Sequence, residues 1–247
     1  MHAFIFFRKS IYQPREKTDG KRKSVLTGAL PHCYYYFGMF NQPKMNTGEN
    51  GSERKKTMSK TSLAPTNDYC PQTLFLYGTY SEDGSADFGL FCWFSYVWDG
   101  ELGVMACIGG SKLTKENIHR RKVFSANLVT EPLLPLADYL GNTSGHDPMK
   151  MKKDIQIEDG RVLHVPVLSA SPVSYELEVK QFIPLHDGEV MLCAIRNILQ
   201  DDSLAKCPDT SPWEKLTAIA PVKTTCRRYF GWNGADLGAW GEPMAKL

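Results

Sequence analysis

The stretch LGVMACIGGSKLTKENI, from Leu102 to Ile118, is the most informative part of this chain. Its first seven residues are mostly apolar and of strand length, and two glycines, Gly109 and Gly110, follow them. A Ser-Lys-Leu-Thr sequence comes next, which is typical of a helix start. The stretch therefore predicts a strand, a tight bend, and a helix that begins at the bend.

The bend has two interpretations. Glycine lets backbone approach a ligand closely, and free N–H groups at a helix N-terminus attract anions. Ser111 and Thr114 would add hydroxyl donors and Lys112 a positive charge, which together suit one phosphate group. The alternative is an ordinary turn in which Ser111 or Thr114 caps the helix. The glycines are adjacent, so this is not the Gly-x-x-x-x-Gly-Lys-[Ser/Thr] phosphate loop, and the local sequence leaves both interpretations open.

Charge divides the 247 residues into two parts, although the net charge is only +2. Residues 1–60 hold twelve basic and four acidic residues, whereas residues 61–247 hold 17 and 23. The first part shows no sustained hydrophobic period, which predicts a disordered basic extension before a folded domain at 61–247. A basic arm for nucleic acid or an acidic membrane is the alternative, but its basic residues lack amphipathic spacing. We therefore expect no nucleic-acid or membrane partner.

The seven cysteines include no Cys-x-x-Cys pair, and Cys92, Cys107 and Cys193 lie inside apolar runs. A buried thiol behaves as a small hydrophobic group, so we expect neither a disulfide framework nor a metal site. This usage indicates a reducing, cytoplasmic compartment. No apolar run approaches the ~20 residues that a membrane helix needs.

Short strands dominate the predicted secondary structure. The hydrophobic pattern predicts strands at 73–79, 88–98, 102–108, 123–130, 173–179 and 189–199, and helices at 113–122, 131–140 and 213–219. We expect Gly141 to end the second helix, and strand 173–179 to be half-solvated because apolar and polar residues alternate there. Hairpin signals such as Asp99-Gly100 favour a mainly β fold, an antiparallel barrel with short helical insertions.

Three segments carry a family resemblance: Ala86–Ser95, the Gly-Gly-Ser-Lys-Leu-Thr turn, and Phe124–Leu128. In this order they resemble the flavin reductase-like, FMN-binding split β-barrel proteins, including flavoredoxin-type members, over roughly residues 73–247. The resemblance implies an antiparallel split barrel that binds FMN. It also implies cofactor contacts from three regions: the flavin ring beside Cys92, Trp93, Phe94 and Ser95, the phosphate at Ser111, Lys112 and Thr114, and Asn127 near the cofactor.

The chain departs from the Asn-x-x-Pro-Phe-Ser pattern that is frequent in that family, since Asp87, Leu90, Phe91 and Cys92 stand there. Loss of the proline loosens the approach of that strand, and Asp87 is expected to add negative charge near the cofactor.

The resemblance implies a homodimeric flavin reductase that takes hydride from NADH or NADPH. Hydride transfer to a flavin depends on positioning, so no catalytic residue is assigned. Two alternatives are a flavoredoxin-type electron carrier with a redox protein partner, and a non-enzymatic flavin-binding module. The chain has neither a Gly-x-Ser-x-Gly nucleophile elbow nor a Gly-x-Gly-x-x-Gly dinucleotide motif.

Overall fold

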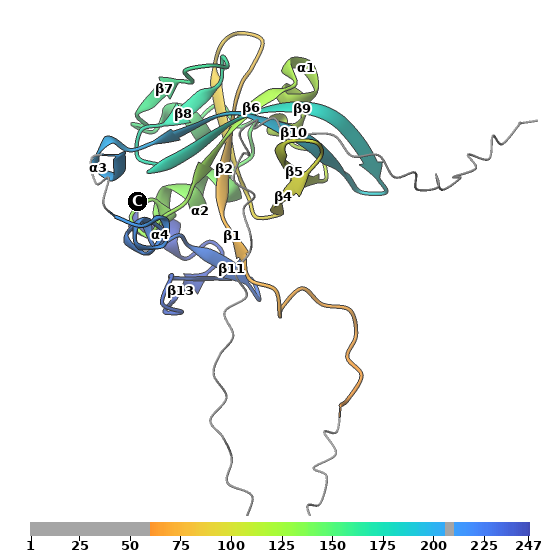
Figure 1. The fold of residues 1–247 in the computed structure, drawn as a ribbon, viewed down its shortest axis with the longest axis vertical. Helices are drawn as coiled ribbons and strands as arrows, with labels where there is room; N and C mark the ends of the chain where they lie inside the picture. The colour runs from red at the N-terminus through yellow and green to blue at the C-terminus, as the bar shows by residue number, and fades with distance from the viewer. Residues whose placement is uncertain (1–59, 206–209) are drawn as a thin grey trace, which may run out of the picture. The chain divides into compact units, whose positions relative to one another are not determined.

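The computed structural model of the chain describes residues 60–205 and 210–247 (Figure 1). The predicted extension at 1–60 lies outside the described residues, apart from Lys60. All strand pairs in the described part are antiparallel, and strands far outnumber helices there. The predicted mainly β class is therefore confirmed. In the described part no helix is long and apolar enough to cross a membrane.

A seven-stranded sheet forms the body of the domain, in the order β3-β2-β6-β9-β10-β5-β4. Its strands are β2 (Phe75–Tyr80), β3 (Ala86–Phe91), β4 (Phe94–Trp98), β5 (Leu102–Gly109), β6 (Val123–Leu128), β9 (Val173–Leu185) and β10 (Gly188–Gln200). Strands β3 and β4 lie on opposite edges, yet only Cys92 and Trp93 join them. The sheet must therefore curve until its two edges meet, which makes it a barrel with an unpaired split. The predicted single strand at 88–98 is wrong because the chain crosses this split.

Two smaller sheets and several short helices complete the domain. The small strands are β1 (Gln72–Thr73), β7 (Ile157–Asp159), β8 (Pro166–Leu168), β11 (Lys223–Thr225), β12 (Arg228–Phe230) and β13 (Asp236–Ala239). The helices are α1 (Leu113–Arg121), α2 (Leu134–Asn142), α3 (Asp202–Ala205), α4 (Pro212–Ile219), and the 3₁₀ turns η1 (Lys150–Lys152) and η2 (Pro243–Lys246). Strands β11 and β13 and helix α4 lie beside α2 at one end of the large sheet (Figure 1).

The second predicted helix is displaced, because α2 begins three residues later than expected and runs through Gly141. A Cβ atom at Gly141 would lie 2.7 Å from the Leu90 Cβ. This glycine therefore allows α2 to pack closely against β3, and it does not end the helix as the sequence suggested.

Two hydrophobic clusters cover the two faces of the large sheet. Tyr77, Ile108 and Phe124 belong to the cluster enclosed by the barrel, whereas Leu76 and Phe88 pack with Leu140 of α2 on the other face. Successive residues of a strand point to opposite faces, so β2 is buried on both sides. This double burial explains its nearly continuous apolar sequence.

Glu176 shows why strand 173–179 is not half-solvated as predicted. Its side chain points away from the barrel core but is fully buried. Its carboxylate accepts the backbone N–H groups of residues 161–163, and the Asn197 amide donates to it at 2.7 Å. Burial raises the pKa of the Glu176 carboxyl, but these four donors stabilise the charged form, and the net effect is a lowered pKa.

Replacing Glu176 with Gln tests this network. A Gln amide nitrogen cannot accept the donors that face one carboxylate oxygen, so Glu176→Gln should cost about 2–3 kcal/mol of unfolding free energy at pH 7. The folded-state pKa is lowered, so the advantage of the wild type should be full above the unfolded pKa near ~4.3 and shrink as the pH falls through it. Urea unfolding at several pH values measures both effects. Glu178→Gln, at a half-exposed position where the carboxylate pairs with Arg196, is the control, and an equal loss in both variants would contradict the assignment.

Candidate functional site

The crossing between β3 and β4 exposes one aromatic side chain at the split. Cys92 and Trp93 leave the sheet ladder, and the Trp93 carbonyl accepts the Cys107 N–H of β5 at 3.0 Å. This bond holds the crossing against β5. Trp93 is 51% exposed at this crossing.

The bend after β5 leaves the N-terminus of α1 open. Gly110 adopts a φ of +65° and donates its N–H to the Asp187 carbonyl at 2.8 Å. Lys112 occupies the N-cap position in an extended conformation, and no side chain caps the helix. The N–H groups of the first turn, on residues 113–115, have no partner within the helix. The expected Thr114 cap is therefore wrong, and the helix end presents unpaired donors beside an ammonium group.

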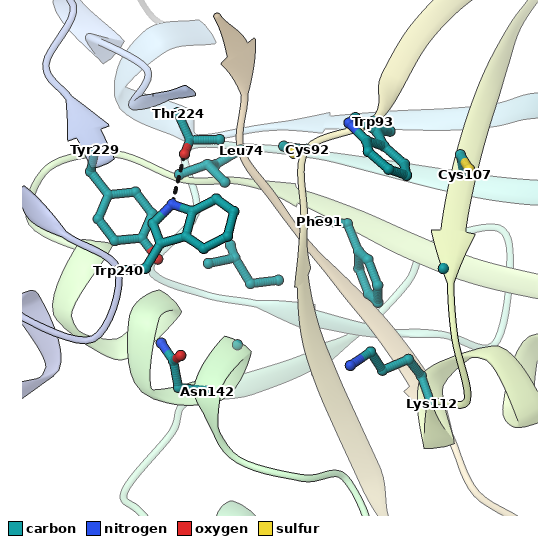
Figure 2. Close-up of a pocket in the computed structure, with 13 residues that line it drawn as sticks. Leu74, Phe91, Cys92, Trp93, Cys107, Lys112, Asn142, Thr224, Tyr229 and Trp240 are labelled. Atoms are coloured by element: carbon teal, nitrogen blue, oxygen red, sulfur yellow. Dashed lines mark hydrogen bonds between the residues drawn. The ribbon is translucent and has the colours of Figure 1, made fainter. Parts of the chain in front are cut away.

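A cavity of about 320 Å³ lies between the split, the bend and the C-terminal segment. Its lining consists of Leu74, Leu90, Phe91, Cys92, Trp93, Cys107, Gly109, Lys112, Gly141, Asn142, Thr224, Tyr229 and Trp240. Figure 2 shows Lys112 reaching from the bend toward Phe91, with Trp240 and Tyr229 at the opposite end. The cavity is thus mainly apolar, with a positive charge at one end.

A buried carboxylate positions the C-terminal end of the cavity. Asp138 of α2 accepts the Tyr229 hydroxyl at 2.7 Å, and it also accepts the backbone N–H groups of Gly241 and Met244. The indole N–H of Trp240 donates to Thr224 Oγ1 at 2.9 Å (Figure 2). Burial and the bond to Asp138 raise the pKa of Tyr229, so its hydroxyl stays a donor. Asp138 and Trp240 were not predicted, because nothing local in the sequence links residues about a hundred positions apart.

The thiols of the cavity wall are held in the neutral form. Burial raises the pKa of Cys92, and burial together with the nearby Glu189 carboxylate raises the pKa of Cys107. A neutral thiol is a weak nucleophile. These two residues therefore line the cavity and do not act as reactive groups.

Only some of the predicted cofactor residues come together at this cavity. Cys92, Trp93 and Lys112 line it, and Ser111 is exposed in the bend next to Lys112. Phe94 instead stacks on Phe75 with ring centroids 4.2 Å apart. Ser95 is exposed on β4.

Asn127 is fully buried, and its side chain is hydrogen-bonded to neighbouring strands. Its amide donates to the Leu76 carbonyl and to Ser125, and its carbonyl oxygen accepts the Leu168 N–H and the Ser174 hydroxyl. These bonds join β2, β6, β8 and β9 and use the polar atoms of the side chain. Asn127 does not line the cavity.

Thr114 belongs to a buried polar cluster behind the bend. Its hydroxyl donates to Asp87 Oδ2 at 2.7 Å, and Lys150 Nζ lies 2.8 Å from Asp87 Oδ1. Both ionic side chains are only 3% exposed. The expectation that Asp87 adds negative charge to the site is therefore wrong, because Lys150 neutralises it inside the protein. The Thr114 side chain is used to hold α1 in place.

The fold and the site together define a split β-barrel with an uncapped helix N-terminus and Lys112 next to an aromatic cavity. Residues 68–209 match the family model of the flavin reductase like domain. The match covers more than half of the chain, so this chain belongs to the flavin reductase-like family. Membership supports a flavin-related oxidoreductase function. No curated protein sequence matches the chain.

Solved structures show the same fold. Flavoredoxin of Desulfovibrio vulgaris (Miyazaki F) is 22% identical, with a TM-score of 0.62 over 70% of this chain and 93% of that one. Flavoredoxin from Methanosarcina acetivorans is 16% identical, with a TM-score of 0.62 over 76% and 100%. The styrene monooxygenase flavin reductase from Pseudomonas putida S12 is 14% identical, with a TM-score of 0.52 over 66% and 91%. At these identities the similarity concerns the fold alone.

Proposed function

We propose that this protein binds FMN in the cavity and acts as an NAD(P)H-dependent flavin reductase. The observation that carries the proposal is the uncapped N-terminus of α1, with Lys112 beside it, at one end of an aromatic cavity. A flavin mononucleotide has matching parts, namely a dianionic phosphate and a flat, largely apolar ring. When bound, FMN would supply the two-electron redox chemistry.

The phosphate end of the site is matched by fixed donors. The N–H groups of residues 113–115 and the positive end of the helix dipole attract a dianion, and Lys112 adds a formal charge. Ser111 is exposed in the same bend and offers a hydroxyl. Thr114 contributes through its backbone N–H, since its side chain is committed to Asp87. Five of the described residues, 111–115, thus suit one phosphate group.

The rest of the lining suits the ring. Phe91, Trp93 and Trp240 supply aromatic faces, and Leu74 supplies aliphatic surface, so these residues exclude water from the ring. The volume is at the lower end of the ~300–1,000 Å³ range of small-molecule sites. The Cys92 thiol is neutral and adds no charge. The residues present therefore fit a flavin, with the backbone of the β3–β4 crossing along its edge.

Catalysis would then depend on positioning. Hydride transfer requires the nicotinamide to lie parallel to the exposed face of the flavin, and no side chain needs to exchange a proton in that step. The exposed Trp93 leaves room on the solvent side for a transient nucleotide. The second candidate is an electron carrier that exchanges electrons with a redox protein, which the fold of the flavoredoxins favours.

We also propose a cytoplasmic location and a homodimer. The location is supported by the five cysteines of the described part, which are all free thiols. The dimer is supported by the outer face of β5, where Cys107 lines the cavity and Met105, two residues earlier, is exposed. A second copy seated on this face would cover Met105.

Reversing the charge of Lys112 tests the phosphate site. Lys112→Glu places a carboxylate beside the bound dianion, so the Kd for FMN should rise at least tenfold, about 1.4 kcal/mol. Fluorescence titration with FMN measures the change. Lys122→Glu makes the same charge change at the other end of α1, about 15 Å away, and should leave the Kd within twofold. Equal effects in the two variants would show that the phosphate is bound elsewhere.

Anaerobic reduction distinguishes the reductase from the carrier. The FMN-loaded protein should lose its visible flavin absorbance within minutes when NADH or NADPH is added without oxygen. Dithionite provides the reference for complete reduction. Bleaching by dithionite and by neither nucleotide would exclude the reductase and leave the electron carrier. A protein that purifies colourless and is not stabilised by added FMN would contradict both the reductase and the carrier.

The association state tests the dimer. Light scattering should give twice the 27.8 kDa chain mass for the wild type. Met105→Glu should give the monomer mass, because an unpaired carboxylate at the centre of an apolar contact is costly. Leu185→Glu changes an equally exposed apolar residue near the tip of the β9–β10 hairpin and should stay dimeric. A monomeric wild type would exclude the dimer.

A further inference from the structure

A second cavity, of about 510 Å³, adjoins the first and shares Cys92, Trp93, Thr224 and Trp240 with it. Its remaining wall is more polar and comes from two segments far apart in the chain, residues 67–72 and the turn after β11. Each segment contributes one exposed cysteine, Cys70 and Cys226. Neither thiol is used by the proposed flavin site.

Strand pairing brings these two cysteines to the same end of one ladder. Gln72 pairs with Thr224 and Thr73 with Lys223 in the antiparallel β1–β11 ladder. Cys70 and Cys226 each lie two residues beyond the Gln72–Thr224 pair, at the same end of the ladder. Paired Cα atoms of an antiparallel ladder are about 4.5–5.5 Å apart, so the two segments leave it from neighbouring positions, and a disulfide spans Cα separations of about 4.4–6.8 Å. Both cysteines stand just past the ladder, in turns whose side chains are exposed.

Side-chain contacts join the two turns. The Cys226 Sγ lies 3.6 Å from the Asp68 carbonyl oxygen, and Thr225 Oγ1 donates to the same oxygen at 2.7 Å. Cys70 belongs to that same turn, because its N–H donates to the Asn67 carbonyl at 3.3 Å. The turn after β11 therefore already packs against the turn that carries Cys70.

The backbone at Cys226 is also strained. Cys226 and Arg227 have φ values of +52° and +56°, and they form the two-residue loop between the paired residues Thr225 and Arg228. Such loops favour Asn and Gly, which adopt positive φ at lower cost. Strain of this kind is concentrated at functional positions. Here it places a thiol at the rim of the second cavity.

We propose that Cys70 and Cys226 form a reversible dithiol–disulfide site that exchanges with low-molecular-weight disulfides. Cys70 accepts a hydrogen bond from the Gln72 amide at 2.9 Å, whereas the Cys226 thiol donates to the Asp68 carbonyl, so Cys70 is assigned as the attacking sulfur. Its thiolate breaks the S–S bond of the small disulfide, forms a mixed disulfide and releases one thiol. Cys226 then loses its proton to water and displaces the second thiol. Two protein thiols are oxidised, and one disulfide is reduced to two thiols.

Oxidised glutathione tests the proposal on the full chain without FMN, so the outcome is independent of the proposed flavin chemistry. The reduced protein, treated with excess oxidised glutathione, should lose two hydrogen atoms in intact mass. Chymotrypsin cuts after Tyr69 and Phe75, and the digest should contain a peptide of residues 70–75 linked to one that holds Cys226. Dithiothreitol should reverse the linkage.

Matched variants identify the sulfur atoms. Cys70→Ser and Cys226→Ser should each abolish the linkage, whereas Cys107→Ser should retain it. The oxidised wild type should also unfold at a higher temperature than the reduced protein, since the bond closes a long loop, and this shift should vanish in both Cys70→Ser and Cys226→Ser. Glutathione attached separately to Cys70 or Cys226, a linkage to another cysteine, or no reaction at these two thiols would overturn the proposal.

Discussion

The buried ion pair between Asp87 and Lys150 is the interaction on which the site depends. It joins β3 to η1, and the bond from Thr114 to the same carboxylate adds the first turn of α1. An unpaired charge at this depth would be strongly destabilising, so the three elements hold one arrangement. Lys112 is at the N-cap position of α1, and the N–H groups of the first turn have no side-chain cap.

Other buried polar side chains around the cavity also form their hydrogen bonds within the protein. Asp138, buried in α2, accepts hydrogen bonds from the Tyr229 hydroxyl and from two N–H groups of the C-terminal segment. These bonds fix the segment that carries Trp240. Asn127 joins four strands behind the wall. In each case a buried polar side chain pairs with other polar groups of the protein, while backbone N–H groups and aromatic faces remain at the cavity. Such an arrangement suits a protein whose cofactor supplies the chemistry.

The sequence predicted the parts of the fold that depend on local patterns. The strand, bend and helix of residues 102–121 are confirmed because apolar runs, paired glycines and helix starts are short-range signals. The split at Cys92 could not be predicted, since the sequence stays apolar where the chain passes from β3 at one edge of the sheet to β4 at the other. Glu176 was misjudged for a related reason, because the loop that buries it comes from residues 161–163. Of the candidate site, Cys92, Trp93 and Lys112 reach the cavity, whereas the roles of Asp87, Asp138 and Trp240 arise from contacts distant in sequence.

A crystal structure of the protein with FMN tests the central claim most directly. The account predicts phosphate oxygens within about 2.7–3.2 Å of the N–H groups of residues 113–115, with the Lys112 ammonium on the same group and the ring against the wall formed by Phe91 and Trp93. FMN found with its phosphate away from α1, while the bend faces solvent or an adjacent loop, would contradict the account.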